Sequence, residues 1–151
     1  MKVIAWSENL TQQRCYEVGA ERVAKDDLLR RADVVTIHTR LSERTRGLIG
    51  ARELALMKPT AHLINTSRGP VVDETALIAA LKEGRIAGAA LDVYDREPLP
   101  PDHPLRSAPR VLLTPHIGYV TECTYRVFYT GMVNAIEGWL AGKPVGVIEP
   151  T

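Results

Sequence analysis

Cysteine is scarce in this sequence, and its scarcity argues against two kinds of site. The 151 residues include only two cysteines, Cys15 and Cys123, which stand far apart and form no C-x-x-C pair. We therefore expect free thiols in a reducing compartment rather than a disulfide framework or a thiolate metal site. No metal site of another kind is expected either.

Long apolar runs and an excess of one charge are also missing. No apolar stretch approaches the roughly 18 residues of a membrane span. The apolar start meets Ser7 and Glu8 too soon to form the core of a signal peptide. Lys and Arg number 19 and Asp and Glu 18, a net charge of +1, which argues against nucleic acid and anionic membranes as partners. We expect a cytoplasmic protein.

Short β-rich runs alternate with helical patterns along the whole chain. Strands are predicted over residues 2–6, 21–24, 33–38, 61–65, 86–93 and 111–113, and helices over 11–18, 26–31, 52–57, 73–84 and 121–141. This order predicts an α/β fold with a mainly parallel sheet covered by helices on both faces. We expect one domain over residues 1–151, with residues 143–151 as a C-terminal tail.

Several polar side chains fall at or just after the carboxyl ends of predicted strands, where ligands bind in open α/β sheets. These residues are His38, Arg68, Asp92 and His116. Arg68 can hold a carboxylate through two parallel hydrogen bonds. His116 can take and return a hydroxyl proton, and an ionised Glu97 bound to it would favour the imidazolium and fix its tautomer. The set suits the oxidation or reduction of a small 2-hydroxy or 2-keto acid, although each residue alone also has a structural explanation.

Three segments together resemble the catalytic segments of the D-isomer-specific 2-hydroxyacid dehydrogenases. They are Leu63–Gly69 (LINTSRG), Leu91–Pro98 (LDVYDREP) and Thr114–Gly118 (TPHIG), and their order and spacing match that family. The resemblance covers essentially the whole chain. It implies a truncated Rossmann-like, doubly wound fold without its first βα unit, NAD or NADP as cofactor, a small 2-keto or 2-hydroxy acid as substrate, and a homodimer or larger assembly.

The resemblance also implies a role for each site residue. Arg68 would bind the substrate's carboxylate and carbonyl, Glu97 would tune His116, and His116 would donate and accept the proton. Asp92 would hold the nicotinamide carboxamide. The expected cofactor-binding residues are Ser7, His38, Thr39, Thr66, Ser67, Arg68, Asp92, His116, Gly118 and Tyr119.

Two departures from the family pattern bear on the cofactor. The Gly-rich loop G-x-G-x-x-G that should precede Lys2 is absent from the sequence, so a backbone N–H cradle for pyrophosphate is missing. We therefore expect this chain alone to bind NAD weakly. Ser7 stands where the family usually has an acid for the ribose hydroxyls, so we expect NADPH to be accepted as well as NADH.

The strand that would carry the loop is central in the Rossmann order 3-2-1-4-5-6. Without it, the predicted strands 2–6 and 33–38 have facing unpaired edges, which seek another strand. Three outcomes are open: the two strands pair directly, strand 2–6 and its neighbour detach, or a second chain fills the gap.

The resemblance implies that the chain is part of an oxidoreductase that transfers hydride between NAD(P) and a 2-keto or 2-hydroxy acid. The alternatives are a non-catalytic dinucleotide-binding module like the corepressor-type members of the family, or an inactive fragment. Turnover of 2-keto acids with NADH and NADPH would separate them.

Overall fold

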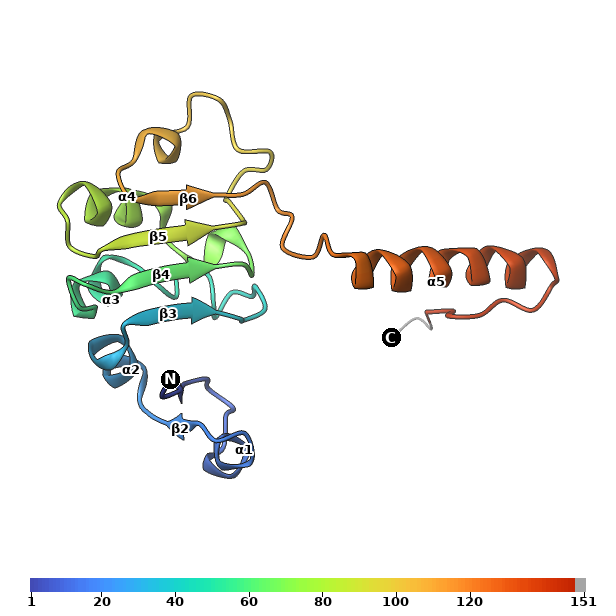
Figure 1. Cartoon of the computed structure of the whole chain (residues 1–151), viewed down its shortest axis with the longest axis horizontal. Helices are drawn as coiled ribbons and strands as arrows, with labels where there is room; N and C mark the ends of the chain where they lie inside the picture. The colour runs from blue at the N-terminus through green and yellow to red at the C-terminus, as the bar shows by residue number, and fades with distance from the viewer. Residues whose placement is uncertain (149–151) are drawn as a thin grey trace. The chain divides into compact units, whose positions relative to one another are not determined.

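A computed structural model describes residues 1–148 (Figure 1). The chain divides into two compact units, Met1–His116 and Ile117–Thr151, and each is described by itself. Of the predicted tail, residues 143–148 form no helix or strand, and residues 149–151 lie outside the described residues. The expectation of one domain over the whole chain stays a prediction.

A four-stranded parallel sheet forms the centre of the first unit. Its strands are β3 (Val34–Ile37), β4 (His62–Asn65), β5 (Gly88–Leu91) and β6 (Val111–Leu113), and they lie side by side in chain order (Figure 1). Every pair is parallel, and the last residues of the four strands are in register: Ile37 with Asn65, Asn65 with Leu91, and Leu91 with Leu113. The predicted α/β class with a parallel sheet is confirmed.

The first two strands form a separate parallel sheet of their own. β1 (Ile4–Ala5) pairs with β2 (Glu21–Arg22), and each is shorter than the sequence pattern predicts. Within residues 1–148, β1 pairs only with β2, and β3 pairs only with β4. Of the three predicted outcomes, direct pairing of the two strands is therefore not what the structure shows, and the other two stay predictions.

Helices follow the strands as predicted, and side chains cap the starts of two of them. α1 (Gln12–Glu17) begins after Thr11, and α4 (Glu74–Lys82) begins after Asp73, whose carboxylate accepts the Ala76 N–H at 3.0 Å. Two further helices are α2 (Lys25–Arg31) and α3 (Ala51–Leu56). Two short 3₁₀ turns, η1 (Gly69–Val71) and η2 (Pro104–Ser107), were not predicted.

The apolar core lies between the main sheet and the helices α2, α3 and α4. These helices contribute fully buried leucines, and the sheet contributes alternate residues of its strands: Leu29, Leu54, Leu77 and Leu81 from the helices, and Val35, Ile37, Leu63 and Leu91 from the sheet. Each such side chain contributes about 1.5–3 kcal/mol when it leaves water. The opposite face is open within this unit, where Val34 and Leu112 are 51% and 64% exposed.

The second unit contains one long helix, α5 (Glu122–Leu140), which begins after Thr121 as predicted. Thr121 Oγ1 accepts the Thr124 N–H at 3.1 Å. No residue of this helix is buried. Among residues 1–148, none of the helices combines the length and hydropathy needed to cross a bilayer.

Candidate active site

The predicted catalytic residues gather where β4, β5 and β6 end. Because these strands are parallel and end in register, the segments that follow them emerge at one edge of the sheet. Arg68 follows β4, Asp92 and Glu97 follow β5, and His116 follows β6.

The turn that carries Arg68 is built around the buried amide of Asn65, which is 1% exposed. Asn65 Nδ2 donates to the Arg68 carbonyl at 2.9 Å, and its Oδ1 accepts the Ser67 N–H at 3.0 Å and the Ser67 hydroxyl at 2.9 Å. The exposed Arg68 donates through Nη1 to the Ser67 carbonyl at 2.6 Å. This buried network fixes the backbone of the turn while it leaves the guanidinium at the surface.

Glu97 and His116 form the central pair of the site. His116 Nδ1 lies 2.6 Å from Glu97 Oε2, and Glu97 Oε1 accepts the Tyr94 N–H at 2.9 Å. Burial acts to raise the pKa of Glu97, but the hydrogen bonds from His116 and Tyr94 and the charges of His116 and Arg68 outweigh it and lower the pKa. Glu97 is therefore ionised at neutral pH, and as an acceptor it places the proton on Nδ1. Nε2 is the other nitrogen of the His116 ring, and it is the one whose proton could be exchanged with a substrate while Nδ1 stays bound to Glu97.

The backbone of His116 has a φ of 57°, which is uncommon for a residue other than glycine, although histidine is one of the residues enriched there. Its N–H donates to the Thr114 carbonyl at 3.1 Å. The left-handed conformation directly follows Pro115, which ends the strand. Such local strain is typical of functional sites held by their surroundings.

Asp92 and Tyr94 connect β5 to the segment after β6. Asp92 is 5% exposed, and its Oδ1 accepts the Thr114 hydroxyl at 2.5 Å. The buried Tyr94 hydroxyl lies within hydrogen-bond distance of the carbonyls of Leu91 (3.1 Å) and Thr114 (2.8 Å). Burial and the nearby Asp92 charge raise the pKa of Tyr94, so the phenol stays protonated and can donate. These contacts hold Glu97 and His116 on neighbouring, mutually braced segments.

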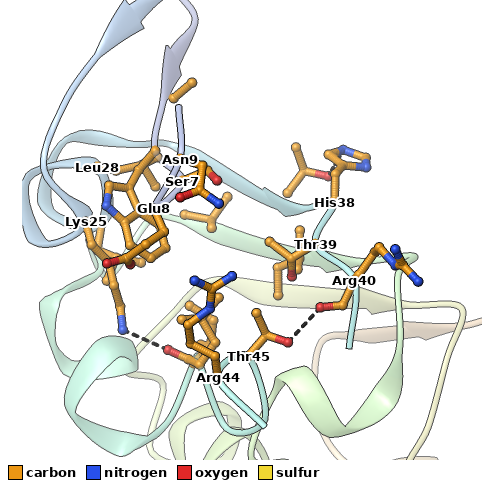
Figure 2. Close-up of a pocket in the computed structure, with 18 of the residues that line it drawn as sticks. Ser7, Glu8, Asn9, Lys25, Leu28, His38, Thr39, Arg40, Arg44 and Thr45 are labelled. Atoms are coloured by element: carbon orange, nitrogen blue, oxygen red, sulfur yellow. Dashed lines mark hydrogen bonds between the residues drawn. The ribbon is translucent and has the colours of Figure 1, made fainter. Parts of the chain in front are cut away.

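A second group of predicted residues lines a cavity of about 860 Å³ beside β1 and β3. Ser7 lies on the β1 side, and His38 and Thr39 lie just after β3 (Figure 2). His38 Nε2 is 3.0 Å from the Thr36 hydroxyl. This cavity does not include Arg68, Glu97 or His116. The structure thus separates a predicted cofactor group from the catalytic group, although both lie beyond the carboxyl ends of strands.

The Thr39 hydroxyl provides a test of whether this cavity suits a nucleotide. Its Oγ1 is buried and finds no hydrogen-bond partner among residues 1–148, and a buried polar atom left unpaired costs about 1–3 kcal/mol. A hydroxyl or phosphate oxygen of a bound nucleotide would supply the missing partner. The cavity is also within the usual size of small-molecule sites, about 300–1,000 Å³. The residues present therefore fit a dinucleotide.

The remaining predicted residues fall into two groups. Thr66 and Ser67 lie in the turn before Arg68, next to the catalytic group. Gly118 and Tyr119 belong to the second unit, and their cofactor role stays a prediction. The sequence analysis missed the roles of several residues that build the site: Asn65, Gly69, Glu74, Tyr94 and Thr114. Only Asn65 carried a signal, because an amide that directly ends a buried strand needs internal partners.

The chain is similar to known proteins over most of its length. Residues 1–118 match the family model of the D-isomer specific 2-hydroxyacid dehydrogenase, NAD binding domain. A glyoxylate reductase of Aeropyrum pernix is 48% identical over 82% of this chain and 37% of that protein. A D-3-phosphoglycerate dehydrogenase of Synechocystis is 44% identical over 95% of this chain and 26% of that protein.

One solved structure shows the same likeness in three dimensions. A D-isomer specific 2-hydroxyacid dehydrogenase from Lactobacillus delbrueckii, in its NAD-complexed form, superposes with a TM-score of 0.80 at 33% identity, over 97% of this chain and 48% of that one. The chain therefore spans less than half the length of each of these proteins. Its Rossmann-like fold, predicted from the resemblance, is confirmed.

Proposed function

The chain belongs to the family of D-isomer specific 2-hydroxyacid dehydrogenases, and we propose that it is the cofactor-binding and catalytic part of an oxidoreductase that interconverts small 2-keto and 2-hydroxy acids. The observation that carries the proposal is the Glu97–His116 pair, 2.6 Å apart, at the sheet edge that also presents Arg68. In this pair, one oxygen of the Glu97 carboxylate accepts the Tyr94 N–H and the other faces His116. A surface histidine without a function does not require a carboxylate that is oriented in this way.

Each catalytic side chain has one task in this proposal. Arg68, exposed on a rigid turn, binds the substrate carboxylate with its planar fork. His116 donates a proton from Nε2 to the keto oxygen during reduction and takes it back during oxidation. Glu97 holds Nδ1–H, keeps the ring orientation and stabilises the imidazolium.

The proposed cofactor is a nicotinamide dinucleotide, which supplies or accepts the hydride when bound. NAD is the cofactor named in the description of the family model, and Ser7 in place of an acid supports acceptance of NADP as well. Ser7, His38 and Thr39 would hold it in the cavity, and Asp92 would receive its carboxamide N–H groups.

Glyoxylate and hydroxypyruvate are the substrates that we propose to test first, because glyoxylate reductases and glyoxylate/hydroxypyruvate reductases are among the similar proteins. A small keto acid also suits an edge that presents the exposed Arg68. We keep a cytoplasmic location as part of the proposal, in agreement with the free thiols of Cys15 and Cys123.

The test measures turnover of 2-keto acids with NADH and NADPH by this chain, and by a chimera that joins it to the N-terminal part of the Aeropyrum pernix protein. In the chimera, His116→Ala should lower kcat by at least about 100-fold with little change in cofactor affinity. Arg68→Lys should mainly raise KM, because lysine lacks the planar fork. Arg85→Lys, a surface arginine paired with Glu83, is the control and should change neither constant.

The outcomes distinguish the alternatives. A folded chimera that binds NAD but shows no turnover would indicate a binding module. A near-normal kcat for His116→Ala would exclude His116 as the proton donor and overturn the proposed mechanism.

A further inference from the structure

The loop that carries Glu97 is held by a carboxylate from another element. Glu74, in the first turn of α4, accepts the Asp95 N–H through Oε1 at 2.9 Å. The Glu74 side chain is only 13% exposed. Asp95 lies between Tyr94, whose N–H binds Glu97, and Glu97 itself. A single hydrogen bond thus ties the middle of the catalytic turn to a helix of the core.

The second oxygen of Glu74 fixes the far end of the same loop. Glu74 Oε2 lies 3.3 Å from His103 Nε2, and His103 Nδ1 accepts the Leu105 N–H at 3.3 Å. Because Nδ1 accepts, the ring proton of neutral His103 is on Nε2, the nitrogen that faces Glu74 Oε2. Leu105 is fully buried, so the chain is anchored there as well. Both oxygens of one carboxylate therefore clamp a loop whose middle contains Glu97.

We propose that Glu74 is a positioning residue for the Glu97–His116 pair: it holds the Asp95 backbone so that Glu97 faces His116. The assignment of the pair as catalytic rests on the proposed function, but the positioning itself does not. Glu74 lies outside the three segments that carry the family resemblance, and its two carboxylate oxygens contact Asp95 and His103.

A competing explanation is that Glu74 merely stabilises α4. An acid in the first turn of a helix interacts favourably with the helix dipole, and Glu74 is such an acid. The two explanations differ in what they require. Helix stabilisation needs the negative charge, whereas positioning needs the reach of the side chain to Asp95.

Two substitutions separate charge from reach. Glu74→Asp keeps the charge but shortens the side chain by one methylene, so it loses the Asp95 bond. Glu74→Gln removes the charge but keeps the length and one carbonyl oxygen for the Asp95 N–H. Positioning predicts that Asp is the more damaging replacement, and helix stabilisation predicts that Gln is. Glu83→Gln, at the other end of α4 and solvent-exposed, is the matched control.

The readout is carboxyl NMR of Glu97 in the 151-residue chain, which needs no turnover. Glu74→Asp should raise the pKa of Glu97 toward its ordinary value, because the Glu97 carboxylate loses part of its hydrogen bonding. Glu74→Gln and Glu83→Gln should leave that pKa unchanged. In the unsubstituted chain the Asp95 amide should exchange slowly with solvent, which can be measured even if a variant does not fold.

Activity gives an independent arm. In the active chimera, Glu74→Asp should lower kcat by about tenfold while KM changes little, since misplacement affects the reacting geometry. An unprotected Asp95 amide in the unsubstituted chain would overturn the proposal. So would a Glu97 pKa that moves with Gln and not with Asp. If the unsubstituted chimera showed no turnover while the Glu97 pKa responded to the Glu74 variants as expected, the proposed function would be contradicted and the positioning role of Glu74 would stand.

Discussion

Gly69 follows Arg68 and lies directly against the backbone of Tyr94 and Asp95. A Cβ atom built on Gly69 would overlap the Tyr94 carbonyl carbon and oxygen and the Asp95 nitrogen, closer than real Cβ atoms approach any atom. These are main-chain atoms of the loop that Glu74 and Tyr94 hold in place, so no side-chain rotation can relieve the overlap. Gly69→Ala must therefore displace either the Arg68 turn or the Glu97 loop.

The expected cost is at the upper end of overpacking, about 3 kcal/mol. For a chain of this size that corresponds to a fall in Tm of about 6–12 °C. Thermal unfolding followed by circular dichroism measures it. Gly131→Ala is the control, because a Cβ there meets nothing within 4 Å and alanine is favoured over glycine inside a helix.

The functional consequence can be measured in the same variant. Displacement of either segment moves Arg68 relative to Glu97, so the charge of Arg68 should no longer help to lower the Glu97 pKa. A Gly69→Ala chain with a Tm within about 2 °C of the unsubstituted chain and an unchanged Glu97 titration would refute the close approach on which this reasoning depends.

Three further predictions concern acid stability, cofactor choice and assembly. Burial acts to raise the pKa of Glu53, but hydrogen bonds from Lys25, Gly50 N–H and Arg52 lower it from 4.5 to about 2. The ionised Glu53 therefore adds at most about 3 kcal/mol to the free energy of unfolding. This contribution is complete above pH 4.5 and is lost as the pH falls toward 2. Urea unfolding of Glu53→Gln should lack this pH dependence, and a Glu53→Gln chain that kept it would contradict the low pKa of Glu53. With Ser7 in place of an acid, the active chimera should prefer NADH over NADPH by less than about 100-fold in kcat/KM, and a larger preference would disprove it. Light scattering should show that the 151-residue chain is dimeric or larger, and calorimetry should show that it binds NAD weakly. A stable monomer with micromolar affinity for NAD would show that the unpaired strand edges affect neither assembly nor cofactor binding.

The order of strands and helices could be predicted because its signals are local. A β-branched run ended by a proline or a small-residue turn defines a strand, and a side-chain cap defines the start of a helix. Thr11, Asp73 and Thr121 each accept the N–H three residues on, at the starts of α1, α4 and α5. The predicted ends of the strands differ from the observed ones by up to two residues, because pairing with a neighbour, rather than composition, decides where a ladder ends.

The catalytic contact was predictable for a different reason. Glu97 and His116 follow neighbouring parallel strands, and the resemblance assigned them to one pair, which the structure shows at 2.6 Å. The residues that position this pair had no comparable signal. Glu74 is 21 residues from Asp95 in sequence and lies in another element, and the need for glycine at position 69 arises only from the fold that brings Tyr94 against it.

The pairing of β1 shows that a sequence pattern does not specify which strand a segment pairs with. Carbonyls of Val3 and Ala5 accept N–H groups of the β2 segment at 3.0 and 3.1 Å. Since successive carbonyls of a strand point to opposite edges, the Ile4 carbonyl points to the edge away from β2. Likewise the Asp33 carbonyl accepts from His62 in β4 at 3.0 Å, so the Val34 carbonyl points to the edge away from β4.

Both edges belong to strands that line the same cavity, which contains Ile4 on one side and Thr36 on the other. An apolar pattern specifies that a segment is a strand, but it carries no information about which main chain completes its hydrogen bonds. Only a topological rule, the Rossmann strand order, predicted that these two edges would be unpaired.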